Sequence, residues 1–389
     1  MKNSLRGPLL LSFSALFSML LAESALRIVA PLAGRGDELR FPVRQQIPGL
    51  RSEARYERNG FGFRSLSMTT AAKPPRTLRV VVLGGSTTDE ATHDTRDMWS
   101  GRLEARLSEA LAPLGLAVQV LAYGRPGHTI VESLAFARQH LLGFEPDLVI
   151  SLHGINELAW RGGPDYSYDG SSIAASAHPA WPARAEDFCL DSLQLCRRVR
   201  VAKNRLGIWW ALRRGRALGW QSDELPVRRA EYASLPFVAA PVRRSDPSAE
   251  LRDGLAALLD WARSEQLDAV VLGQPTLWEA TPSTEERATY WFAIQTPDGP
   301  VRADPAWMAS ELRRYNQLQR EVTSQRGFAF FDLEPTLPKD LDHFIDDCHF
   351  TVHGSDRVAA QLAPLVAEML KVRAARSQRP SGNSLRVER

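Results

Sequence analysis

A serine early in the chain and a histidine late in it are of the types that together transfer acyl groups. Ser86 follows a β-branched run that stops at two glycines, over residues 80–85, which predicts a buried strand turning sharply into a helix. His349 follows Asp346 by three residues. A carboxylate at this spacing can orient an imidazole, which then takes the proton of a serine hydroxyl. We therefore predict Ser86 as nucleophile, His349 as base and Asp346 as its orienting carboxylate.

Other interpretations of the same residues stay open. A turn of two glycines and a serine can also bind phosphate or only reverse the chain, although the Gly-Lys-Ser/Thr of a phosphate-binding loop is absent. Asp347 is a rival partner for His349. His353 follows His349 at a spacing that suits a helical metal pair, but the glutamate of the zinc pattern is missing. We predict no metal and no other cofactor.

Two further short segments could stabilise the oxyanion of acyl transfer. Gly127 ends the segment 124–127, and a residue without Cβ lets its backbone N–H approach a substrate closely. Asn156 follows an apolar run and could donate through its side-chain amide. The backbone N–H of Ser86 is the third predicted donor. An ordinary turn glycine and a helix N-cap are the alternative roles of Gly127 and Asn156.

These side chains need a scaffold that brings distant parts of the chain together. Short apolar runs without polar alternation predict strands covered on both faces. They lie at 78–83, 117–122, 147–152, 268–272 and 328–332. Helical patterns alternate with them near 97–113, 130–143, 249–266, 307–326 and 355–372. The alternation predicts right-handed βαβ units, a parallel sheet of about five strands, and a site at its carboxyl edge.

Four segments in this order resemble the SGNH, or GDSL-type, hydrolases over roughly residues 78–157 and 268–370. The segments are 80–88, 124–127, 154–157 and 346–354. The resemblance implies a flavodoxin-like three-layer α/β/α domain with five parallel strands. It also implies a serine hydrolase of carboxylic esters with a Ser86, His349 and Asp346 triad, and an oxyanion hole formed by Ser86, Gly127 and Asn156.

Four positions depart from the usual pattern of that family. Gly85 replaces the aspartate before the serine, and Glu90 replaces a glycine four positions after it. Ala122 stands where an asparagine commonly opens the second segment, and Glu157 replaces the aspartate after the asparagine. None of these changes removes a group that the chemistry needs.

Residues 1–29 are predicted to be a targeting segment. Lys2 and Arg6 precede an apolar stretch over 7–22, which predicts an apolar N-terminal helix. An uncleaved signal anchor, a cleaved signal peptide and a buried helix are the alternatives, and the poor cleavage site at 22–24 favours the anchor. The preceding positive charge predicts that the rest lies outside the cytoplasm, on the periplasmic or extracellular side. This plan is similar to that of membrane-anchored bacterial members of the family.

The rest of the chain divides by composition into an arm, a domain and a tail. The arm and tether spans 30–76, the hydrolase-like domain 77–372 with an insertion at 158–248, and a basic tail, expected to be disordered, 373–389. Eight basic residues between 193 and 220 predict either a lid or membrane-surface helix, or a packed helix with a solvated basic face. Cys189 and Cys196 could pair in an oxidising compartment.

The composition is that of an ordinary globular protein. The 389 residues are 44% hydrophobic and 24% charged, and the net charge of +3 is too small to indicate nucleic acid. We predict a serine esterase acting on an acyl ester of a glycan, lipid or small molecule, with acetyl as a candidate acyl group. An O-acyltransferase that moves the acyl group to a sugar hydroxyl is the alternative. A non-catalytic binding domain on a hydrolase scaffold is a third interpretation.

Overall fold

The computed structural model describes most of the chain. The described residues are 6–29, 43–45, 54–59, 61–163, 165–177, 193–196, 198–199, 202–203, 206, 225–243 and 245–377. The predicted tail from 378 and much of the predicted basic segment at 193–220 lie outside them. Helix α13 (Val352–Ser377) continues past residue 373, where the tail was expected to begin.

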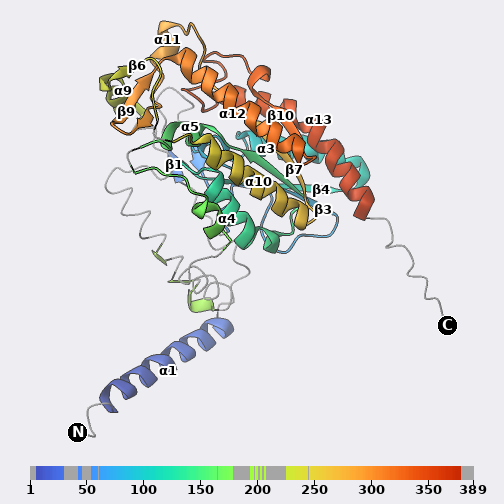
Figure 1. The fold of residues 1–389 in the computed structure, drawn as a ribbon. Coiled ribbons are helices and arrows are strands. Elements are labelled where there is room, and N and C mark those ends of the chain that lie inside the picture. The colour runs from blue at the N-terminus through green and yellow to red at the C-terminus, as the bar shows by residue number, and fades with distance from the viewer. Residues whose placement is uncertain are drawn as a thin grey trace, which may run out of the picture.

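A five-stranded parallel sheet forms the centre of the molecule (Figure 1). Its order is β10-β7-β5-β3-β4, which counted along the chain is the flavodoxin-like 2-1-3-4-5 read from the β4 edge. The strands are β3 (Thr77–Gly84), β4 (Ala117–Gly124), β5 (Leu148–Leu152), β7 (Asp268–Gly273) and β10 (Ala329–Asp332). The sequence prediction of about five parallel strands is confirmed.

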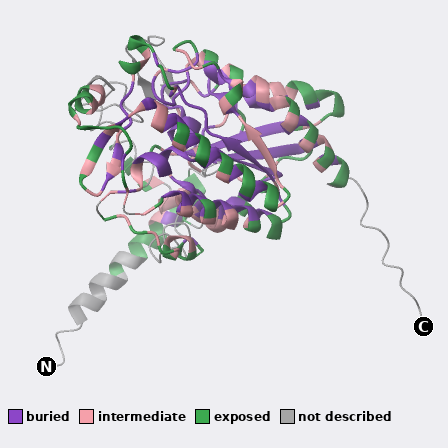
Figure 2. Ribbon diagram, turned by 45° about the horizontal axis from the view of Figure 1, so that its top comes forward, coloured by how far each residue is buried: buried purple, intermediate pink, exposed green. Residues whose placement is uncertain are grey.

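Helices cover both faces of this sheet and complete three layers. Helices α3 (Trp99–Leu111) and α13 pack together on one face. The other face is covered by α4 (Ile130–His140), α10 (Ser248–Ser264) and α12 (Pro305–Gln325), which lie in front of the sheet in Figure 1. Figure 2 shows the strands buried between the layers. Every residue of β3 is buried, as expected for a central strand with an unbroken apolar run.

The segment before β3 wraps around the free edge of β4. Arg64 and Ala122 exchange backbone hydrogen bonds of 3.0 and 2.9 Å, which closes part of this edge. The guanidinium of Arg64 is buried and donates to the carbonyl oxygens of Asp89, Glu90 and His93. These carbonyls follow the short helix α2 (Ser86–Asp89), so the arm fixes the segment just after Ser86.

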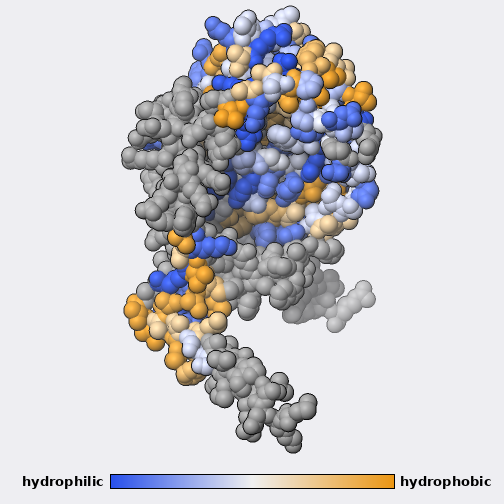
Figure 3. Space-filling model, turned by 90° about the vertical axis from the view of Figure 1, so that its left-hand side faces the viewer, coloured by the Kyte–Doolittle hydropathy of each residue, from blue (hydrophilic) through white to orange (hydrophobic). Residues whose placement is uncertain are grey.

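The N-terminal residues form helix α1 (Arg6–Val29). Apolar side chains are exposed along its described part (Figure 3). Near its end, the carboxylate of Glu23 accepts hydrogen bonds from the backbone N–H groups of Gln194 and Leu195, at 2.9 and 2.8 Å. Within the portion of the chain that the structure describes, no helix is both long and apolar enough to cross a membrane.

Small elements decorate the carboxyl edge of the sheet. Helix α5 (Ile155–Trp160) leads into the insertion, which then forms α6 (Ser171–Ala175), α9 (Leu225–Ser234) and β6 (Phe237–Val238). The connection between β7 and α12 supplies α11 (Thr284–Arg287), β8 (Ile294–Thr296) and β9 (Gly299–Ala303). Strands β6, β9 and β8 form a second sheet that the sequence did not predict. The remaining pair is β1 (Val43–Gln45) with β2 (Ala54–Tyr56).

Cys196 is disulfide-bonded, and Cys189, its predicted partner, lies outside the described residues.

Candidate active site

Ser86 is the first residue of α2, and Gly85 alone separates it from the end of β3. The two preceding glycines make this turn possible. A Cβ on Gly84 would lie 2.2 Å from Oγ1 of Thr88, and a Cβ on Gly85 would lie 2.4 Å from Nδ2 of Asn156. A Cβ on Gly84 would also lie 2.7 Å from the backbone carbonyl oxygen of Leu152, so position 84 needs glycine, whereas a side chain at position 85 would require the Asn156 amide to shift. Gly85, where the family usually has aspartate, therefore leaves room for the amide of Asn156.

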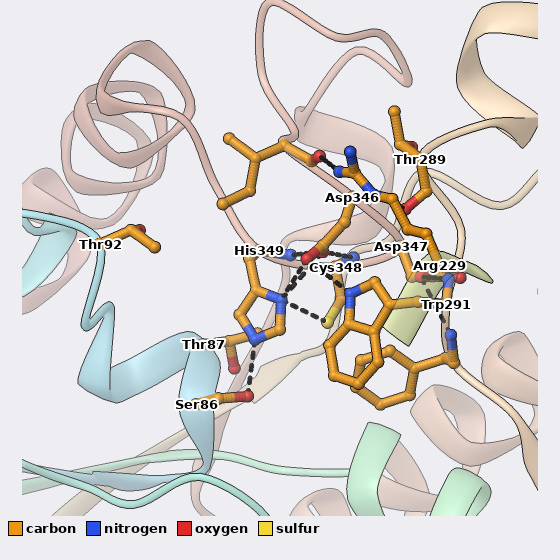
Figure 4. Close-up of polar contacts among 12 residues, drawn as sticks. Ser86, Thr87, Thr92, Arg229, Thr289, Trp291, Asp346, Asp347, Cys348 and His349 are labelled. Carbon is orange, nitrogen blue, oxygen red and sulfur yellow. Dashed lines mark hydrogen bonds and ion pairs between the residues drawn. The ribbon is translucent and has the colours of Figure 1, made fainter. Parts of the chain in front are cut away.

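Ser86, His349 and Asp346 form one hydrogen-bonded series (Figure 4). Oγ of Ser86 lies 2.7 Å from Nε2 of His349, and Nδ1 of His349 lies 2.9 Å from both carboxylate oxygens of Asp346. The serine comes from the end of β3, and the other two residues come from the loop before α13. All three are buried. In this geometry an imidazole can accept the serine proton while the carboxylate fixes its tautomer.

Asp346 is held as a carboxylate by the donors around it. Burial alone would raise its pKa, but the His349 ring, the indole N–H of Trp291 and the backbone N–H of His349 together hold that pKa below its ordinary value. The indole donates at 2.8 Å, and the backbone N–H groups of Cys348 and His349 donate at 3.0 and 2.9 Å. The negative charge of Asp346 stabilises the imidazolium that forms when His349 takes a proton.

Asp347, the rival partner, faces away from His349. Its carboxylate accepts from the indole N–H of Trp278 and the backbone N–H of Trp291, both at 2.7 Å, and from the backbone N–H of Phe292 at 3.2 Å. Burial and the neighbouring charge of Asp346 raise its pKa. Asp347 thus anchors the loop that carries Trp291 against the loop that carries Asp346.

Trp291 is a site residue that the sequence analysis missed. Its indole bonds to Asp346, and its ring lies parallel to that of His349, with an interplanar angle of 6° and centroids 6.1 Å apart. It lies in the connection between β7 and α12, where no motif marks it. A tryptophan in a long irregular connection that follows a buried strand was the only available signal.

The side-chain amide of Asn156 and the carbonyl oxygen of His128, the residue after Gly127, lie next to Gly85. Nδ2 of Asn156 donates to the carbonyl oxygen of His128 at 2.6 Å, and that carbonyl would lie 3.3 Å from a Cβ on Gly85. Gly127, one residue earlier, has a φ of +77° and faces open space. Asn156 is the second residue of α5, and the N-cap position belongs to Gly154. The amide of Asn156 therefore does not cap its own helix.

Glu157 takes the place of the usual aspartate and ties two of these segments together. Its carboxylate accepts from the backbone N–H of Ile130 at 2.7 Å and from that of Gly154 at 2.9 Å. Burial raises the pKa of Glu157 to about 7. These two hydrogen bonds hold the loop that carries Gly127 and the start of α5 at a fixed distance from each other.

Glu90 stands where the family usually has a glycine, and its backbone has the conformation that glycine favours. Its φ is +40°, at the end of α2. The strain is offset by its carboxylate, which accepts from the backbone N–H of Trp99 at 2.6 Å and from the hydroxyl of Ser355. Burial raises the pKa of Glu90 to about 8. Glu90 thereby links the segment after Ser86 to the helix that follows His349.

The described residues include one cluster with metal-ligand chemistry, formed by Asp346, Cys348 and His349 within 4.8 Å of one another. Its donors are already engaged, because Nδ1 of His349 bonds to Asp346. Burial, together with Asp346 and Asp347, raises the pKa of the Cys348 thiol, which disfavours the thiolate that binds metals. The ring of His353 packs against His343, with centroids 4.7 Å apart, instead of joining the cluster. The cluster does not fit a resident metal.

Comparison with known proteins agrees with this architecture. The profile of the GDSL-like Lipase/Acylhydrolase family matches residues 82–357, which is more than half of the chain. The chain therefore belongs to the GDSL-like lipase/acylhydrolase family, and it is an enzyme of the ester-hydrolase type.

Several solved structures are similar to this chain at low identity. A lipase/acylhydrolase from Enterococcus faecalis is 15% identical, with 75% of this chain and 96% of that chain covered and a TM-score of 0.39. A carbohydrate acetylesterase family member from Sinorhizobium meliloti is 14% identical, with 76% and 99% covered and a TM-score of 0.39. A putative GDSL-like lipase from Parabacteroides merdae is 12% identical, with 75% and 96% covered and a TM-score of 0.40. A search of curated proteins found no match.

Proposed function

We propose that this enzyme hydrolyses a carboxylic ester with Ser86 as nucleophile, His349 as general base and acid, and Asp346 as the carboxylate that orients the imidazole. The observation that carries the proposal is the 2.7 Å contact between Oγ of Ser86 and Nε2 of His349 while Nδ1 of the same ring bonds to Asp346. His349 takes the serine proton as Oγ attacks the ester carbonyl, and it returns that proton to the leaving alcohol. Water then attacks the acyl-enzyme by the reverse proton route, which releases the acid.

The oxyanion of each tetrahedral intermediate is stabilised by the backbone N–H groups of Ser86 and Gly127 and by the side-chain amide of Asn156. The support for this assignment is the convergence of Asn156 and the Gly127–His128 segment on Gly85. Donors fixed in place before the reaction stabilise developing charge without reorganising. We propose an acyl ester of a glycan, lipid or small molecule as substrate, with acetyl as a candidate acyl group.

The test is Ser86→Ala in the full chain, assayed with p-nitrophenyl acetate and with a fluorophosphonate probe. We expect the variant to lose activity by about 10³-fold or more and to lose labelling, with an unchanged melting temperature, because the nucleophile is gone. Addition of a sugar acceptor to the wild-type assay distinguishes hydrolysis, which releases the free acid, from acyl transfer, which gives an acylated sugar. Retention of more than a tenth of the activity by Ser86→Ala would remove this serine from the mechanism.

We also propose that the domain works outside the cytoplasm, where residues 1–29 direct it. Lys2 and Arg6 ahead of the apolar stretch support this location. The disulfide at Cys196 supports it independently, since such bonds persist in oxidising compartments. A fusion of the full chain to alkaline phosphatase should be active, and fractionation of the same cells tells whether the protein stays with the membrane. An inactive fusion would contradict the location.

A further inference from the structure

A cavity of about 510 Å³ opens beside the candidate active site. It is bounded by α9 of the insertion and by the β8–β9 hairpin. Its lining residues are Trp160, Val227, Arg228, Glu231, Tyr232, Leu235, Trp291, Ala293 and Pro300. A volume of this size lies within the range of small-ligand sites in proteins.

Two tryptophans connect this cavity to the reacting groups. The indole N–H of Trp291 donates to Oδ2 of Asp346 at 2.8 Å, and the indole N–H of Trp160 donates to Oδ1 of Asn156 at 3.2 Å. One wall residue thus contacts the carboxylate that orients His349, and the other contacts the proposed oxyanion donor. The cavity is therefore one side chain away from Asp346 at Trp291 and one side chain away from Asn156 at Trp160.

The wall formed by α9 is fixed in place. Arg229 donates to the carbonyl oxygens of Thr289 and Ile345, at 3.2 and 3.1 Å, the latter directly before Asp346 (Figure 4). After α9 the chain pairs with β9, and Arg302 bonds through its backbone and side chain to the carbonyls of Pro236 and Leu235. Helix α9 is held at its middle and directly after its C-terminal end, so the cavity is formed before any substrate binds.

The chemistry of the lining selects one kind of occupant. Aromatic rings and small apolar side chains supply flat apolar surfaces, while Arg228 and Glu231, three residues apart on α9, supply hydrogen-bond donors and acceptors. Arg228 lies over the ring of Trp291, with its guanidinium carbon 5.0 Å from the ring centroid. A long acyl chain would desolvate both charged groups without bonding to them, which is costly. A sugar ring has apolar C–H faces and hydroxyls at its edge, and it satisfies both kinds of surface.

We propose that this cavity binds the sugar part of an acylated carbohydrate, so that α9 and the β8–β9 hairpin determine specificity for glycan esters. The inference rests on the esterase function proposed above and names its substrate class. The acyl carbonyl lies at Ser86, and the sugar that leaves as the alcohol occupies the cavity. Binding energy from this remote part of the substrate then lowers KM for sugar esters and not for simple aryl esters.

The test uses Val227→Trp, which fills the cavity from an exposed position of α9, in the full chain. Ala233→Trp is the matched control, because Ala233 is exposed on the same helix and does not line the cavity. The three substrates are a methyl glycoside that carries a single O-acetyl group and keeps its other hydroxyls free, p-nitrophenyl acetate and p-nitrophenyl octanoate. We expect Val227→Trp to lower kcat/KM for the sugar ester at least tenfold, mainly through KM, and to leave p-nitrophenyl acetate within twofold. The control should leave all three rates unchanged.

A second variant keeps the test independent of folding. Glu231→Gln changes an exposed group without adding volume and should raise KM for the sugar ester several-fold. Unchanged sugar-ester kinetics in both variants, or a selective loss of the octanoate, would overturn the sugar assignment, the latter in favour of an acyl-chain site. Failure of the proposed esterase function can be distinguished from failure of the sugar assignment. In that case the wild type would hydrolyse neither of the two aryl esters and would not react with the fluorophosphonate probe.

Discussion

Trp291 donates its indole N–H to the carboxylate of Asp346 at 2.8 Å, while its own backbone N–H donates to the carboxylate of Asp347 at 2.7 Å. One residue of the β7–α12 connection therefore holds both members of an adjacent acidic pair. The two aspartates face different partners, and their pKa values move in opposite directions. This arrangement assigns Trp291 as a positioning residue for the proposed triad.

Trp291→Phe keeps the aromatic ring and removes the hydrogen bond to Asp346. A hydrogen bond to a charged group contributes about 1.5–3 kcal/mol, so we expect kcat to fall roughly 10- to 150-fold. Loss of this donor raises the pKa of Asp346, so the acid limb of the rate profile should move to higher pH. Trp278→Phe is the matched control, because its indole bonds to Asp347 instead. Equal kinetic effects of the two variants would assign Trp291 a purely structural role.

Asn156→Ala tests the oxyanion assignment. Removal of one such donor costs about 2.7–4 kcal/mol of transition-state stabilisation, and we expect the loss in kcat with little change in KM. Trp160→Phe removes the hydrogen bond to Oδ1 of Asn156 but leaves the amide group, so it should retain most of the turnover of p-nitrophenyl acetate. A lower melting temperature with unchanged kcat would show that Asn156 serves packing alone.

Glu90 should make the stability of the protein depend on pH. Burial raises the pKa of Glu90 from 4.5 to about 8, so the folded state keeps a proton that the unfolded chain loses. The contribution of Glu90 to stability is therefore fully present below pH 4.5 and is lost as pH rises through about 8. The amide oxygen of Glu90→Gln can still accept from the backbone N–H of Trp99, and the amide has no proton to lose in this pH range.

Melting temperatures at pH 5, 7 and 8.5 measure this effect. We expect the decline between pH 5 and 8.5 to be shallower in Glu90→Gln than in the wild type. Glu109→Gln, an exposed change on α3, is the control for the lost charge and should follow the wild type. Parallel curves for all three proteins would show that Glu90 is ionised in the folded state throughout this range.

Removal of metals should leave the esterase activity unchanged. His349 is already bonded to Asp346, and the high pKa of the Cys348 thiol disfavours a thiolate ligand. The measurement is the rate of p-nitrophenyl acetate hydrolysis after dialysis against EDTA, compared with mock dialysis. Inactivation that zinc or manganese reverses would contradict a metal-free mechanism.

The sequence alone predicted the sheet and singled out the residues proposed for the triad, because both depend on local patterns. Buried parallel strands need unbroken apolar runs, and the spacing of Asp346 and His349 is a property of one short loop. Glycines before Ser86 were visible for the same reason. The flavodoxin-like strand order brings the loops that carry Ser86 and His349 to the carboxyl edge of the sheet. The sequence by itself could not show that the two side chains contact each other there.

The tertiary structure decided what depends on contacts between distant segments. The contact of Trp291 with Asp346 and His349 arises from the way the β7–α12 connection folds over the site, and no local pattern encodes that path. The burial of Arg64 against the carbonyls after α2 likewise requires the arm to be in place. Glu90 could be recognised only as a departure from a family pattern. Its left-handed backbone and its bonds to Trp99 and Ser355 exist only once α3 and α13 have packed together.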